Sequence, residues 1–123
     1  MAALEHVNVT VSDPDATAAM LQAVFGWGVR WSGASKAGGR SVHVGPEGSY
    51  VALYAPGPVR ERGDYREKGW LNHVGVVVDD LADAEARAIV AGLSPVNHGD
   101  YEPGRRFYFN DADGIEWEVV SYG

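Results

Sequence analysis

An internal repeat is the feature that most constrains the fold of this chain. The segment 6–13, HVNVTVSD, reappears as 73–80, HVGVVVDD, at an offset of 67 residues (73 − 6). Each copy opens with a histidine, continues as an alternating apolar strand and ends at an aspartate that precedes a helical pattern. A chain made of two related modules is expected to place the two histidines at equivalent positions, facing a site shared between the modules.

The elements expected in the two copies follow one plan of strand, helix and three strands. In the first copy they are a strand over 4–11, a helix from Asp13-Pro14 to Gly26, and strands over 28–32, 40–45 and 49–55. In the second they are a strand over 70–78, a helix from Asp80 to Gly92, and strands near 95–96, 106–110 and 115–121. The segment 56–69 is charged, contains Pro and Gly and has no periodicity, which is typical of a connection.

The predicted fold class is therefore α+β: two βαβββ modules that form a half-open curved mixed sheet with helices on the outer face. The boundaries are about 1–57 for module one, about 58–69 for the connection and about 70–123 for module two. At 123 residues, the chain is expected to make one domain.

Composition excludes several kinds of function. There are no cysteines, so disulfides, a Cys-ligated zinc site and a thiol nucleophile are excluded. With 17 acidic and 10 basic residues the net charge is −7, which argues against nucleic acid as a partner. No apolar run approaches the ~18 residues of a membrane span, and no signal peptide is visible, so no membrane partner and a cytoplasmic location are expected.

Strand alternation predicts which side chains share a face. Valines at 7, 9 and 11 are expected to pack under the helix, which turns His6 and Asn8 to the open face of the sheet. The repeat extends to 48–54 and 114–120, so that Ala52 is the counterpart of Glu118. His6, His73 and Glu118 then all lie on open faces. Because converging imidazoles and a carboxylate are costly to desolvate unless something satisfies them, a divalent cation is the expected partner of the three.

Other candidates follow from the same facing rule. Tyr108 is flanked by the apolar Phe107 and Phe109, which predicts a hydroxyl on the open face, where a hydrogen-bonding role competes with plain packing. His98 is expected in a loop, either solvated or acting as a catalytic acid or base. Arg106 either binds an anionic substrate group or is an exposed charge beside Arg105. The full set of predicted pocket-lining residues is Asn8, His43, Tyr50, Ala52, Trp70 and Arg106.

The two HVxVxVxD openings and the closing DADG turn before Glu116 and Glu118 resemble the vicinal oxygen chelate superfamily. That superfamily includes glyoxalase I, extradiol dioxygenases, fosfomycin-resistance thiol transferases and bleomycin-binding proteins. The resemblance implies the βαβββ fold and a metal site made by His6, His73 and Glu118. Ala52 stands where glyoxalases have a further glutamate, so the implied ligands are two imidazoles and one carboxylate with open coordination positions.

A second resemblance is to the extradiol dioxygenase signature. His98, Tyr108 and Glu118 correspond to its histidine, tyrosine and glutamate, although Ala112 replaces the proline of the signature. This implies Fe(II) as the favoured metal, with Mn, Zn, Ni or Co as alternatives. Tyr108 and His98 are the implied catalytic residues.

Three functions remain open at this point. The first is a metal-dependent enzyme that chelates vicinal oxygens of a small-molecule substrate, by extradiol-type ring cleavage or by glyoxalase-like lyase or isomerase chemistry. The second is a metal-free binding protein of the bleomycin-resistance type. The third is a degenerate domain without metal. A half-open sheet has edge strands that need cover, and relatives of this size form dimers, so a homodimer is expected, with a site within one chain or shared across two.

Overall fold

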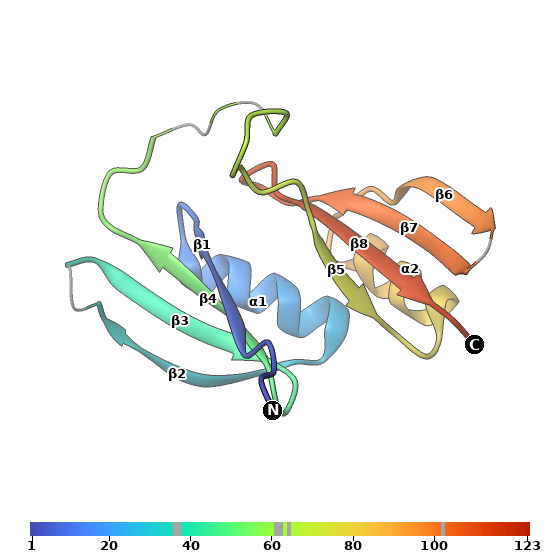
Figure 1. The fold of residues 1–123 in the computed structure, drawn as a ribbon, viewed down its shortest axis with the longest axis horizontal. Helices are drawn as coiled ribbons and strands as arrows, with labels where there is room; N and C mark the ends of the chain where they lie inside the picture. Colours follow the sequence, from blue (N-terminus) through green and yellow to red (C-terminus); the bar gives the residue numbers. More distant parts are fainter. Residues whose placement is uncertain (36–37, 61–62, 64, 102) are drawn as a thin grey trace. The chain divides into compact units, whose positions relative to one another are not determined.

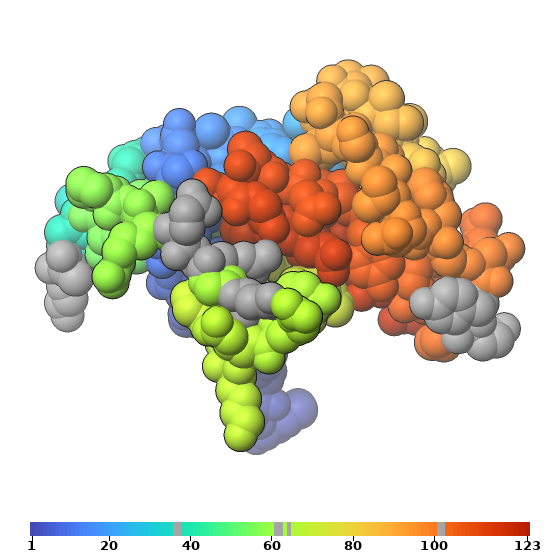
Figure 2. Space-filling model, turned by 90° about the horizontal axis from the view of Figure 1, so that it is seen from above, coloured from blue at the N-terminus to red at the C-terminus, as the bar shows by residue number. Residues whose placement is uncertain are grey.

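The computed structural model describes residues 1–35, 38–60, 63, 65–101 and 103–123. The chain divides into two compact units, Met1–Glu61 and Arg62–Gly123, each with its own sheet and helix (Figure 1). The boundary falls inside the predicted connection at 58–69. The described residues of this connection are mostly exposed, and Figure 2 shows its green to yellow-green atoms at the surface.

The first unit contains one helix and a four-stranded mixed sheet. Its elements are β1 (His6–Thr10), α1 (Pro14–Phe25), β2 (Gly28–Ala34), β3 (Arg40–Gly45) and β4 (Tyr50–Ala55). The strand order is β1-β4-β3-β2, with β1 parallel to β4 and the other pairs antiparallel. Helix α1 contacts β3 and β4 and covers one face of the sheet.

The second unit repeats this topology. Its elements are β5 (Val74–Val77), α2 (Leu81–Val90), β6 (Val96–Tyr101), β7 (Gly104–Asn110) and β8 (Glu116–Ser121). The strand order is β5-β8-β7-β6, again with the first pair parallel, and α2 contacts β7 and β8. The predicted α+β class with two βαβββ modules is confirmed.

Strand register agrees with the sequence repeat. Asn8 pairs with Ala52 across β1 and β4, and Gly75 pairs with Glu118 across β5 and β8. Because these pairs are related by the offsets found in the sequence, Ala52 and Glu118 occupy equivalent positions.

The helix boundaries follow from capping. The Asp13 carboxylate accepts a hydrogen bond from the Ala16 N–H at 3.1 Å, and Asp80 accepts one from the Asp83 N–H at 3.0 Å. Helix α1 ends where Gly26 adopts a φ of 71°, a left-handed conformation that glycine takes without steric cost. Both predicted helix starts are confirmed.

The core of each unit lies between its sheet and its helix. In the first unit Leu21 on α1 and Leu53 on β4 are fully buried. In the second, Phe107 and Trp117 are fully buried on the face of β7 and β8 toward α2. Burying an aromatic or large aliphatic side chain contributes about 1.5–3 kcal/mol each, so the helix-facing alternation stabilises both sheets.

Two strand predictions differ from the structure. The strand expected over 70–78 is shorter, and His73 lies directly before β5. The region of His98, expected as a loop, is strand β6. A bulge between Val96 and Gly99, with Asn97 at a φ of 54°, interrupts the alternation, which is why the sequence pattern did not reveal a full strand there.

Candidate functional site

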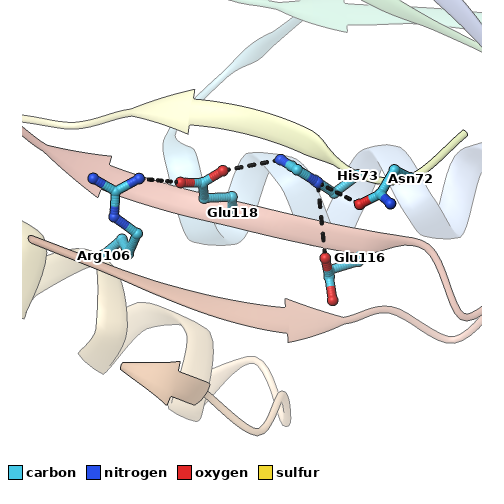
Figure 3. A network of polar contacts seen from close by, with 5 residues as sticks. All are labelled: Asn72, His73, Arg106, Glu116 and Glu118. Atoms are coloured by element: carbon cyan, nitrogen blue, oxygen red, sulfur yellow. Dashed lines mark hydrogen bonds and ion pairs between the residues drawn. The ribbon is translucent and has the colours of Figure 1, made fainter. Parts of the chain in front are cut away.

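A charged network lies on the open face of the second unit (Figure 3). Nε2 of His73 lies 3.0 Å from Oε1 of Glu118, and the other carboxylate oxygen, Oε2, accepts a hydrogen bond from Nη1 of Arg106 at 2.8 Å. On its other side, Nδ1 of His73 lies 2.7 Å from Oδ1 of Asn72 and 3.9 Å from Oε1 of Glu116. The segment before β5 thus supplies the imidazole, β8 the carboxylate and β7 the guanidinium.

Burial makes this network more than a surface ion pair. The side chains of Arg106 and Glu118 are 12% and 13% exposed, whereas His73 is 36% exposed. Arg106 is therefore not an exposed charge like its neighbour Arg105. Each carboxylate oxygen of Glu118 thus has a nitrogen neighbour, Nη1 of Arg106 at Oε2 and Nε2 of His73 at Oε1, and the metal role of Glu118 stays a prediction.

Tyr108 belongs to the same face. It pairs with Glu118 across β7 and β8, and its ring meets the His73 ring edge-on with centroids 6.1 Å apart. Its neighbours Phe107 and Phe109 are fully buried on the opposite face. The predicted facing of Tyr108 agrees with this arrangement.

His98 points away from that network. Its Nε2 lies 2.7 Å from Oε2 of Glu85 on α2, and its ring stacks against Phe107 with centroids 6.0 Å apart. Because Phe107 and α2 lie on the helix side of the sheet, His98 lies on the face opposite Glu118. In this placement the His98 imidazole contacts Glu85 rather than Glu118, and its acid or base role stays a prediction.

The open face of the first unit carries a row of rings, which we name the ring ladder: His6, Tyr50, His43 and Trp31. His6 stacks on Tyr50 at 4.7 Å and 13°, Tyr50 stacks on His43 at 4.7 Å and 25°, and His43 meets Trp31 at 5.0 Å and 49°. Each of the four strands contributes one ring, in the spatial order of the sheet. His43 and Tyr50 were predicted to line a pocket, and Trp31 was missed. Trp31 lies opposite His43 in the pairing of β2 with β3, so knowledge of that strand register would have placed the indole on the same face as His43.

Burial and neighbouring charges act on the His43 imidazole within the ladder. Burial, then the nearby charges of His6 and Arg30, lower the pKa of His43, against a smaller opposing effect of Glu5. His43 is therefore neutral near pH 7. The Arg30 guanidinium lies 4.7 Å above the Tyr50 ring, a cation–π contact.

The two histidines of the repeat share one local arrangement. Nδ1 of His6 lies 2.8 Å from Oε1 of Glu5, and Nδ1 of His73 lies 2.7 Å from Oδ1 of Asn72, in both cases an oxygen of the preceding residue. Such a contact fixes the ring and leaves Nε2 for another partner, as in histidines that bind metals. Imidazole and carboxylate are donor types that suit a divalent ion, and His73 and Glu118 bring one of each together in the second unit.

The predicted site residues are thus distributed over the two units. His73, Glu118, Tyr108 and Arg106 come together in the second, and His6, Tyr50 and His43 in the first, with Asn8 and Ala52 paired in the same sheet. Trp70 lies before β5 and is 42% exposed. Among the described residues of either unit, no three His, Asp or Glu side chains converge as a metal site would require. Likewise, no helix in the described ranges is long and apolar enough to cross a membrane.

Comparison with solved structures identifies the same fold in several proteins. A glyoxylase/bleomycin resistance protein/dioxygenase domain from Frankia sp. EAN1pec is 24% identical, with a TM-score of 0.82 over 98% of this chain and 92% of that one. The fosfomycin resistance protein FosX from Listeria monocytogenes, in complex with Mn(II) and sulfate, is 20% identical, with a TM-score of 0.74 over 98% and 93%. An integron cassette protein from V. cholerae is 20% identical, with a TM-score of 0.70 over 100% and 97%.

No curated protein matches the sequence significantly. A family model does: that of the Glyoxalase/Bleomycin resistance protein/Dioxygenase superfamily matches residues 3–119. The repeat, the two βαβββ modules and this match lead to one conclusion: the chain belongs to the Glyoxalase/Bleomycin resistance protein/Dioxygenase superfamily.

Proposed function

We propose that the protein is a divalent-metal-dependent enzyme that binds two neighbouring oxygens of a small substrate. His6, His73 and Glu118 would hold the metal. The observation that carries this proposal is the contact between Nε2 of His73 and Oε1 of Glu118 at 3.0 Å. When Nδ1 of His73 carries the ring proton and donates it to Oδ1 of Asn72, Nε2 and Oε1 face each other as two electron-pair donors, an arrangement that a metal ion between them would satisfy.

The neighbouring groups support this role. Arg106 holds Oε2 of Glu118, which leaves Oε1 directed at His73. Glu5 and Asn72 fix the two imidazoles through Nδ1. Ala52 supplies no second carboxylate at the position equivalent to Glu118, so the ligand set is the two-histidine, one-carboxylate triad.

A bound divalent metal would supply Lewis acidity to the substrate oxygens. Within that site, Tyr108 would hydrogen-bond to a substrate oxygen, since it lies on the face of Glu118 and beside the His73 ring. Arg106 orients the carboxylate. The triad favours Fe(II) and extradiol-type ring cleavage; Mn, Zn, Ni or Co would fit glyoxalase-like lyase or isomerase chemistry. The Mn(II) bound in FosX, a protein of the same fold, supports a divalent metal.

Elemental analysis of protein purified without chelator tests the metal. We expect about one ion per chain in the wild type, and loss of stoichiometric metal in His6→Ala, His73→Ala and Glu118→Ala. His98→Ala is the matched control, because it removes an imidazole on the helix face. Full metal content in all three ligand variants would refute the assignment. If iron is found, oxygen uptake with a catechol tests ring cleavage.

One observation favours a second candidate, a metal-free binding protein of the bleomycin-resistance type. The Arg106 guanidinium by itself balances the charge of the Glu118 carboxylate at 2.8 Å, so this ion pair is complete without a metal ion. A wild-type protein that binds no divalent metal by calorimetry, while remaining folded, would favour this candidate over the enzyme.

We also propose a homodimer, in which a site is completed either within one chain or by His6 of one chain with His73 and Glu118 of the other. Sedimentation at micromolar concentration tests the assembly. Mixed His6→Ala and Glu118→Ala chains would regain part of the metal content only if the site is shared between chains. A monomer would refute the proposal.

A further inference from the structure

The ring ladder lies outside the hydrophobic core of its unit. The core side of β3 is formed by Val42 and Val44, which are 1% and 0% exposed, and His43 between them points to the opposite face. Four rings in contact on the face away from the helix therefore add little to core packing. An aromatic surface of this kind on a sheet is typical of a ligand-binding face.

The ladder ends in an accessible ring. Trp31 lies on β2, the edge strand of the sheet, and is 47% exposed. Its indole lies across Gly33, since a Cβ built on Gly33 would be 3.1 Å from Cζ2 and 3.4 Å from Cη2 of Trp31. The absence of a side chain at position 33 lets the indole lie there, next to the His43 ring.

The chemistry of the ladder selects a planar ligand with a negative charge. His43 is neutral near pH 7 because burial lowers its pKa, so it stacks as an uncharged ring. Nη2 of Arg30 donates to the carbonyls of Pro46 at 2.6 Å and Ser49 at 2.8 Å, which fixes the guanidinium over Tyr50. Within the described residues, Nε and Nη1 of Arg30 hydrogen-bond to no protein group, so they remain for a ligand.

We propose that the ring ladder binds an aromatic carboxylate, with its planar ring against Trp31 and His43 and its carboxylate directed to Arg30. Aromatic rings stack at centroid distances of about 4.5–7 Å, the spacing that the ladder already uses. Guanidinium and carboxylate form charge-assisted hydrogen bonds. The proposal rests on the proposed function in one respect: the aromatic carboxylate is taken to be the substrate of the metal site.

Calorimetric titration with 2-naphthoate, in the presence of a chelator, tests the ladder independently of the metal. We expect 2-naphthoate to bind, and the saturated decahydro-2-naphthoate and the cationic 2-naphthylmethylamine to bind at least tenfold more weakly. Trp31→Ala should weaken 2-naphthoate binding at least tenfold. Gly33→Ala should weaken it less than Trp31→Ala does, because the added methyl group, 3.1 Å from Cζ2, shifts the indole by a few tenths of an ångström without removing it.

Two variants serve as matched controls. Tyr122→Ala removes an exposed aromatic side chain and Val90→Ala an exposed aliphatic one, both outside the unit that carries the ladder. Both should bind 2-naphthoate like the wild type. Equal affinity for the saturated analogue, or unchanged affinity in Gly33→Ala and Trp31→Ala, would refute the ladder as the binding site. If the wild type binds 2-naphthoate but no divalent metal, the proposal of a metal-dependent enzyme is refuted, and the assignment of the ring ladder as a binding site stands.

Discussion

Replacing Arg106 with methionine would remove the guanidinium from Glu118 and leave the His73 imidazole, 3.0 Å away, as the remaining neighbour of its carboxylate in the described network. The side chains of Arg106 and Glu118 are only 12% and 13% exposed, and Nη1 of Arg106 lies 2.8 Å from Oε2 of Glu118. Removing one partner of a buried ion pair costs about 3–5 kcal/mol, because the other charge stays desolvated. Since Glu118 retains His73 and some exposure, we expect Arg106→Met to lower the free energy of unfolding by about 2–3 kcal/mol.

Urea denaturation followed by fluorescence measures this loss, and a double-mutant cycle assigns it to the pair. The double variant Arg106→Met with Glu118→Gln should be more stable, by about 2 kcal/mol, than the sum of the two single losses predicts. Arg105→Met is the control: it removes an exposed arginine from the adjacent position of the same strand and should change stability by less than about 0.5 kcal/mol. Equal small effects of Arg105→Met and Arg106→Met, or strict additivity in the cycle, would refute the reasoning.

Three further predictions concern pH and local structure. His43→Phe should keep the ring row and flatten the acid side of the profile of unfolding free energy against pH. The pKa of His43 is lowered in the folded state, so its stabilising effect is present above about pH 6.5 and is lost as pH falls through the folded value. Urea unfolding at pH 8 and pH 5 measures this difference. Asp111→Ala should cost about 3 kcal/mol in unfolding free energy, because the carboxylate accepts two backbone N–H bonds and one indole N–H bond at 2.9–3.0 Å. Gly26→Ala should lower the melting temperature, since it costs about 1–2 kcal/mol at a φ of 71°, whereas Gly28→Ala, with the same open space and no positive φ, should not.

The repeated part of the fold was predictable from sequence because it depends on local signals. Alternation, the two aspartate caps and the offset between the copies are short-range features, and they predicted both helix starts and the equivalence of Ala52 with Glu118. The boundaries that were wrong lie where local geometry departs from regular alternation. The bulge between Val96 and Gly99 gives β6 a broken period, so His98 looked like a loop residue.

The sequence alone determined the two modules, the facing of His6, His73, Tyr108 and Glu118, and the absence of cysteine chemistry. Only the tertiary structure decided that Arg106 pairs with Glu118, that His98 bonds to α2 and that four rings form a row. The reason is physical: alternation fixes the face on which a side chain lies, whereas its partner depends on strand order, register and bulges. These bring together residues from strands that are distant in sequence.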